Sequence, residues 1–232
     1  MSQSHEPTRL ILVLEAGDGA TERLAAALAA APVASVVIVA GHGRSFDAAS
    51  VAPLVAAAQK AGAAALIAGD ARLARVLKAD GIHLPASETL ADDYVAAREL
   101  ISPRFIAGVD AGASRHDAMS AGEAGADYVG FSIAPAMATA LAPALTPALT
   151  MAEERAAAVA ERLELVAWWA EIFEVPCVAF DVASLDEARA LAEAGADFIG
   201  VEVGADASPA AIRDRVAAFG AAVAAPRVAI ES

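Results

Sequence analysis

A seven-residue phrase occurs twice in this chain, and its repetition is the strongest constraint on the fold. Ala124–Gly130 reads A-G-A-D-Y-V-G, and Ala194–Gly200 reads A-G-A-D-F-I-G. Each copy follows an alanine-rich helical pattern, so each reads as a helix end, a glycine turn and a short buried strand. Degenerate copies occupy Lys60–Ile67 and Lys78–Leu84. Such alternation of helix and strand predicts a parallel α/β architecture.

Continuing this reading along the chain gives eight strands, each followed by a helix. That number of regular units predicts a single (β/α)8 TIM barrel, because an open doubly wound sheet seldom needs so many. A barrel of this kind uses about 200 to 250 residues as one domain, which suits the 232 residues of this chain. The strands are expected at 9–15, 34–40, 64–68, 81–84, 104–109, 177–180 and within the two copies of the repeated phrase.

We expect residues 9–225 to form the barrel, after a disordered lead at 1–8 and before a tail at 226–232. A low-complexity loop at 133–150 has three prolines and no charge, and reads either as a lid or as a disordered insertion or oligomer contact. The helix expected at 152–174 carries Trp168 and Trp169 near its end. These tryptophans indicate either core packing or the interface of a homo-oligomer.

Composition excludes several classes of protein. A net charge of -14 argues against nucleic-acid binding, which requires clustered lysine and arginine. The bulky apolar runs fall far below the roughly 18 residues that span a bilayer, so we expect no membrane partner. The single cysteine, Cys177, excludes an internal disulfide and a cysteine-cluster zinc site. With no secretory signal pattern at the start, a cytoplasmic location is expected.

Four segments resemble the thiamine phosphate synthase and thiazole tautomerase family. They occur in the family's order and are Lys78–Leu84, Ile106–Val109, Ala124–Gly130 and Pro176–Gly200. The resemblance covers about Leu10 to Gly204. It implies a TIM barrel of thiamine biosynthesis, and a transferase that joins a pyrimidine pyrophosphate to a thiazole phosphate. Pyrophosphate is released in that reaction from a magnesium-bound complex.

The positions that the resemblance assigns to magnesium and to the pyrophosphate are only partly kept. Where the family has Gln-x-Arg-x-Lys, this chain has Gly41-His42-Gly43-Arg44, so only Arg44 supplies charge. The family's Asn-Asp pair, whose Asp binds magnesium, is Gly69-Asp70 here. Glu88 lies beside the position of a second magnesium carboxylate. The resemblance therefore implies Mg²⁺ on Asp70 and Glu88.

The family's phosphate-binding positions depart further. Its Gly-Val-Ser-x-His pattern reads Gly108-Val109-Asp110-Ala111-Gly112, and its Gly-Gly pair after the seventh strand reads Asp181-Val182. The loop that carries Thr and Lys in the family is the uncharged 133–150, and the turn after the eighth strand contains Glu202. Carboxylates repel phosphate at short range, so we expect the standard coupling reaction to be weak or absent.

Five acidic residues are expected at the carboxyl ends of the strands, where barrel active sites form: Glu15, Asp70, Asp110, Asp181 and Glu202. They predict a site for a divalent metal or for a cationic or amine-bearing small-molecule ligand. In that site Asp70 and Asp110 would be ligands or general bases, and His83 or His42 would carry protons. The alternative is that such residues cap helices, since Asp and Ser are common N-caps. The catalytic candidates are Asp70, Asp110, His83 and Asp181, and the substrate-binding candidates are Arg44, His42, Glu15 and Glu202.

Two rival functions stay open at this point. One is a barrel enzyme that uses its acidic mouth on a non-phosphorylated substrate. The other is a non-catalytic binding or interaction protein built on the same scaffold.

Overall fold

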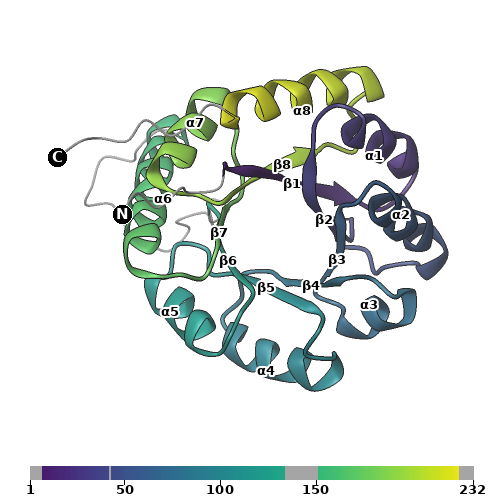
Figure 1. Cartoon of the computed structure of the whole chain (residues 1–232), viewed down its shortest axis with the longest axis horizontal. Coiled ribbons are helices and arrows are strands. Elements are labelled where there is room, and N and C mark those ends of the chain that lie inside the picture. Colours follow the sequence, from purple (N-terminus) through teal and green to yellow (C-terminus); the bar gives the residue numbers. More distant parts are fainter. Residues whose placement is uncertain (1–6, 42, 134–150, 225–232) are drawn as a thin grey trace.

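Eight parallel strands close into a barrel in the computed structural model, which describes residues 7–41, 43–133 and 151–224. Each strand pairs with the next along the chain, and β1 also pairs with β8, which confirms the predicted TIM barrel (Figure 1). The strands are β1 (Arg9–Glu15), β2 (Val33–Val39), β3 (Ala64–Ala68), β4 (Gly81–Leu84), β5 (Ile106–Asp110), β6 (Tyr128–Phe131), β7 (Cys177–Ala179) and β8 (Phe198–Val203).

Helices surround the strands as an outer ring (Figure 1). Several begin at a residue whose side chain accepts a hydrogen bond from the first turn, among them Asp47, Asp70, Ser114, Ser184 and Ser208. These caps satisfy backbone N–H groups that would otherwise lack a partner. The helices are α1 (Ala20–Leu28), α2 (Ala48–Lys60), α3 (Ala71–Leu77), α4 (Leu90–Leu100), α5 (Arg115–Glu123), α6 (Met151–Ile172), α7 (Leu185–Ala194) and α8 (Pro209–Val223).

The strands begin and end close to the residues predicted from the sequence, with local differences. The fifth strand begins at Ile106 rather than Arg104, because a turn in which the Phe105 N–H donates to the Ser102 carbonyl (2.9 Å) precedes it. The last helix continues to Val223, and Phe219 and Val223 are both buried on its inner face.

Two aromatic rings fill much of the barrel interior, and glycines make room for them. A Cβ at Gly108 would overlap the ring of Tyr128, and one at Gly130 or Gly200 would lie within 2.7 Å of the ring of Phe180. Real Cβ atoms do not approach other atoms so closely. Both aromatic side chains are buried, at 6% exposure each. The interior of this barrel is therefore a packed core below its mouth.

The aspartate of the repeated phrase holds neighbouring strands together at the amino-terminal end of the barrel. Asp127 accepts a hydrogen bond from the Ala107 N–H (2.7 Å) and Asp197 accepts one from the Cys177 N–H (2.8 Å). Asp80, in the degenerate copy, accepts from the Ala65 N–H in the same way (2.8 Å). Each carboxylate thus satisfies a backbone donor at the start of the preceding strand.

The long helix α6 packs into the core through Trp169, which is 0% exposed and stacks on Phe173 with ring centroids 4.0 Å apart. Its indole N–H donates to the Val175 carbonyl (2.7 Å). Core packing therefore accounts for this tryptophan. Ile172, near the end of the helix, is 59% exposed, and the homo-oligomer predicted through 152–174 stays a prediction.

Three predicted segments lie largely outside the described residues: the lead at 1–8, the loop at 133–150 and the tail at 226–232. Thr8, within the predicted lead, is described and buried, and its hydroxyl donates to the Ala196 carbonyl (2.9 Å). Among the helices of the described ranges, none is long and apolar enough to cross a membrane.

The aspartate of the repeated phrase can be tested by stability measurements. Asp197→Ala leaves the buried N–H of Cys177 without its acceptor, so we expect a loss of about 1–3 kcal/mol in the free energy of unfolding. Asp197→Asn keeps an acceptor oxygen and should cost less. Urea titration checks both, with the exposed Asp206→Ala as control. Equal stability of the Asp197→Ala variant and the wild type would contradict the assigned role.

Candidate functional site

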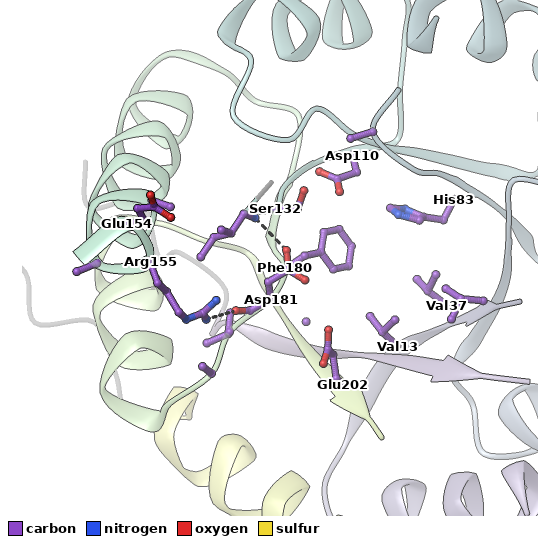
Figure 2. A pocket seen from close by; sticks show the side chains of 18 of the residues that line it. Val13, Val37, His83, Asp110, Ser132, Glu154, Arg155, Phe180, Asp181 and Glu202 are labelled. Carbon is purple, nitrogen blue, oxygen red and sulfur yellow. Dashed lines mark hydrogen bonds between the residues drawn. The ribbon is translucent and has the colours of Figure 1, made fainter. Parts of the chain in front are cut away.

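A cavity of about 1460 Å³ lies at the carboxyl ends of the strands, between the barrel mouth and the first turns of α6. Four of the residues predicted from the sequence line it: His83, Asp110, Asp181 and Glu202. Figure 2 shows the carboxylates of Asp110, Asp181 and Glu202 around one hollow, with the ring of Phe180 between them. The fold thus brings together residues that are distant in sequence, on β4, β5, β8 and the turn after β7.

Asp110, the last residue of β5, is buried at 8% exposure. Its Oδ1 accepts a hydrogen bond from the Gly112 N–H (2.9 Å), and Ser132 donates to the same carboxylate. Burial nevertheless raises the pKa of Asp110, and these hydrogen bonds only partly oppose the rise. Asp110 is therefore a carboxyl group whose charge is costly and whose proton is held more tightly than usual.

Asp181 follows β7 in a left-handed conformation, with φ of 57°. This region is costly for residues with a Cβ and is readily adopted by glycine. Its carboxylate accepts a hydrogen bond from the Ile133 N–H (2.9 Å). Burial raises the pKa of Asp181, the Ile133 hydrogen bond opposes this rise, and the negative charge of Asp110 adds to it. The two carboxylates are therefore near enough to influence each other.

Three arginines hold the backbone on which Asp181 stands. The guanidinium of Arg155 donates to the Asp181 carbonyl (3.1 Å), that of Arg215 to the Val182 carbonyl (3.3 Å), and that of Arg162 to the Phe180 carbonyl. Arg162 is buried and also pairs with Glu187. Consecutive carbonyls of this turn are thus fixed by side chains from α6 and α8, which is how the strained conformation of Asp181 is maintained.

His83 projects from β4 into the cavity, where it is 7% exposed. Its Nδ1 lies 2.8 Å from the hydroxyl of Tyr128, and its ring centroid lies 5.1 Å from that of Phe180. Burial lowers the pKa of His83 to about 4. The imidazole is therefore neutral at physiological pH.

Two other predicted substrate-binding residues, Glu15 and Arg44, do not line this cavity. Glu15 is half-buried at the end of β1, and its carboxylate lies against Gly41. Arg44 is exposed, with its side chain near the same glycine. His42 lies outside the described residues. Of the predicted binding candidates that the structure describes, only Glu202 lines the cavity.

Asp70 lies elsewhere, because its carboxylate caps α3 by accepting a hydrogen bond from the Leu73 N–H (2.8 Å). It lines a smaller cavity of about 430 Å³ between α3 and α4, with Ser87 and Asp93. Glu88 is exposed and lines neither cavity. Within the described ranges, no three His, Cys, Asp or Glu side chains gather to hold a metal ion. Magnesium often binds through only one or two carboxylates, so the Mg²⁺ predicted on Asp70 and Glu88 stays a prediction.

Sequence reasoning missed the basic residues of the mouth. Arg155 and Arg215 both line the cavity, together with Ser132 and Glu154. Both arginines lie on helices, many residues along the sequence from a strand end, and no local motif marks them. Ser132 could have been predicted, because it directly follows β6 and so lies at a strand end, as Asp110 does at the end of β5.

This arrangement suits a small polar ligand. Four carboxylates, including that of Glu154, can accept hydrogen bonds or balance positive charge, and two guanidiniums lie on the wall formed by α6 and α8. A closed (β/α)8 barrel with converging polar groups at the carboxyl ends of its strands is the architecture of a large class of enzymes.

Comparison with known proteins identifies the family within that class. Residues 10–204 match the family described as thiamine monophosphate synthase. Thiamine-phosphate synthase of Erythrobacter litoralis (strain HTCC2594) is 36% identical over 206 residues, which cover 87% of this chain and 89% of that protein. Its counterpart in Hyphomonas neptunium (strain ATCC 15444) is 36% identical over 70% of this chain and 67% of its own length. The chain belongs to the thiamine monophosphate synthase family.

The fold similarity extends to solved structures. A thiamine phosphate pyrophosphorylase from Pyrococcus furiosus superposes with a TM-score of 0.66 at 19% identity, covering 92% of this chain and 95% of that one. At this identity the likeness concerns the fold.

The raised pKa of Asp110 predicts a pH-dependent stability. Because the folded chain binds this proton more tightly than the unfolded chain, stability should fall as pH rises from the ordinary carboxyl range through the raised pKa. Asp110→Asn removes this penalty and keeps an acceptor for the Gly112 N–H. We expect it to raise Tm by a few degrees at neutral pH and to show little difference in acid. Thermal melts over a pH series check this, with the exposed Asp92→Asn as control. A difference in Tm between Asp110→Asn and the wild type that does not vary with pH would contradict the prediction.

Proposed function

We propose that this protein is a divergent member of its family in which the standard coupling reaction is weak or absent. Its cavity instead takes a non-phosphorylated small molecule with a cationic or amine-bearing group. The observation that carries the proposal is the convergence of Asp110, Asp181 and Glu202 on one cavity. We further expect the protein to act in the cytoplasm.

Electrostatics supports a ligand other than a phosphate. Two unit charges about 4 Å apart interact by about 4 kcal/mol near a protein surface, so a phosphate close to these carboxylates would be strongly disfavoured. Asp181 and Val182 stand where the family resemblance implies a Gly-Gly pair whose amides hold phosphate. The φ of 57° at Asp181 is the conformation that glycine adopts easily, which agrees with that correspondence.

The arginines of the cavity do not make it favourable for a phosphate. Arg155 and Arg215 each direct a guanidinium nitrogen to a backbone carbonyl of the turn after β7. They therefore already bind acceptors and balance the charge of the neighbouring carboxylates. Each guanidinium has further N–H groups that can donate to a phosphate, so residual coupling activity has to be measured directly.

Within the proposed site, Asp110 is the candidate general base or cation-binding group, because it is buried and faces the cavity. Asp181 and Glu202 extend the acidic surface toward the rim. Asp70, which the sequence also marked as catalytic, serves as a helix cap outside this cavity and takes no part in the proposed chemistry.

The loss of coupling can be measured directly. With the pyrimidine pyrophosphate, the thiazole phosphate and magnesium, we expect this protein to form thiamine phosphate at least about 100-fold more slowly than the Erythrobacter litoralis enzyme. Asp181→Gly combined with Val182→Gly should recover part of the rate, because it removes a carboxylate and restores the Gly-Gly pair that the family resemblance associates with phosphate binding. Product formation at the rate of that enzyme would overturn the proposal.

The acidic cavity can be tested with benzylamine, which is cationic, against neutral benzyl alcohol. We expect benzylamine alone to raise Tm, by a few degrees at saturating concentration, and Glu202→Gln to reduce the rise. The exposed Glu193→Gln, which lines neither described cavity, is the matched control. If neither compound shifts the melt, the alternative of a non-catalytic interaction protein is favoured.

Magnesium is a separate prediction and enters no step of the proposed function. If it binds at Asp70, its addition should raise Tm, and Asp70→Asn should abolish that rise. Asparagine is as good an N-cap as aspartate, so this variant lowers the charge without removing the cap of α3. A melting temperature that magnesium leaves unchanged in the wild type would contradict the metal site.

A further inference from the structure

A polar pair inside the barrel, His83 and Tyr128, is not used by the proposed function. The two residues stand on β4 and β6, with β5 between them. The strand register aligns His83 with Gly108 and Gly108 with Tyr128. The tyrosine therefore reaches the histidine by crossing β5 at its glycine, where any Cβ would overlap the tyrosine ring. The contact between His83 and Tyr128 therefore depends on the glycine at position 108.

The contact occupies one nitrogen of the imidazole. Nδ1 of His83 lies 2.8 Å from the Tyr128 hydroxyl, and the rings are nearly parallel, with an interplanar angle of 11°. Figure 2 shows the imidazole extending from β4 toward the ring of Phe180, at the floor of the cavity. The other ring nitrogen, Nε2, makes no hydrogen bond with the part of the chain that the structure describes.

The direction of the hydrogen bond follows from counting protons. A phenol has one proton to donate, and the only acceptor recorded for that of Tyr128 among the described residues is Nδ1 of His83. If Nδ1 carried the proton and donated instead, the buried hydroxyl would be left without an acceptor, which is costly. Burial also lowers the pKa of His83, so the doubly protonated ring is disfavoured. The neutral tautomer with hydrogen on Nε2 satisfies both groups.

Asp110 supplies a hydrogen-bond acceptor in the cavity to which His83 presents its Nε2–H donor. It stands on β5 two residues beyond Gly108, the partner of His83, and lines the same cavity. Its carboxylate accepts hydrogen bonds from Gly112 and Ser132 and, with two oxygens, has room for one more. A donor from β4 and an acceptor from β5 thus line one cavity together with the ring of Phe180, which offers an apolar surface.

We infer that Tyr128 is a positioning residue that fixes His83 as a hydrogen-bond donor, and that His83 and Asp110 together select a ligand with an acceptor beside an N–H group. A primary amide has this chemistry. The inference rests on the proposed function only in using the same cavity, and it adds that a ligand there pairs an N–H group with a hydrogen-bond acceptor.

The tautomer can be read from ¹⁵N chemical shifts of the imidazole, which separate protonated from unprotonated ring nitrogens. The chain has four histidines, so replacing His5, His42 and His116 by Gln leaves His83 alone. We expect a protonated Nε2 and an unprotonated Nδ1 at neutral pH. Tyr128→Phe should yield a mixture of tautomers, because the donor to Nδ1 is removed while the ring remains.

The chain has two tyrosines, so Tyr94→Phe provides the same chemical change away from the site. The Tyr94 hydroxyl contacts Arg98 on α4, and its loss should leave the His83 shifts unchanged. Gly108→Ala, which displaces the Tyr128 ring, should act like Tyr128→Phe. A wild-type imidazole protonated at Nδ1, or shifts indifferent to Tyr128→Phe, would overturn the inference.

Ligand selection is tested with benzamide, which has both an acceptor and N–H donors, against acetophenone, which has only the acceptor. Measured by saturation-transfer NMR, benzamide should bind in preference to acetophenone, and Tyr128→Phe should weaken it about fivefold, as expected for one hydrogen bond. Equal binding of the two compounds would overturn the ligand assignment. Because benzylamine tests the acidic cavity independently, failure of this selection is distinguishable from failure of the proposed function.

Discussion

The site of this protein depends on a steric constraint inside the barrel: two aromatic rings occupy space that glycines leave free. Tyr128 lies over Gly108, and Phe180 lies between Gly130 and Gly200. Because these rings fill space inside the barrel, the cavity lies at the mouth, where the ring of Phe180 lines it. The same packing brings Tyr128 to His83. One side chain, Tyr128, thus both packs the interior and contacts His83.

The repeated phrase combines three tasks in a few residues. Its aspartate accepts a hydrogen bond from the start of the preceding strand, its aromatic residue fills the interior, and its final glycine admits the ring of Phe180. The second copy repeats this arrangement one pair of strands further around the barrel. A phrase that first indicates alternating helices and strands therefore also encodes how the interior is packed.

The acidic mouth was predictable in part. Asp110, Asp181 and Glu202 converge because the carboxyl ends of parallel strands meet at one end of a barrel, whatever their distance in sequence. Asp70 follows a strand in the same way, yet its carboxylate turns to cap α3, since unsatisfied N–H groups of the first turn compete for it. Glu15 and Arg44 are directed to Gly41 instead. Position at a strand end does not by itself fix where a side chain points.

The sequence alone determined the barrel, its strand order and the family, because the periodicity of strands and helices and the spacing of glycines are local properties that survive divergence. Only the tertiary structure decided the composition of the site. Arg155 and Arg215 reach it from helix faces that carry no motif, and the turn at Asp181 keeps its left-handed conformation because three arginines bind successive carbonyls. Those contacts join residues far apart in sequence. They are set by how α6 and α8 pack on the barrel, which no short segment specifies.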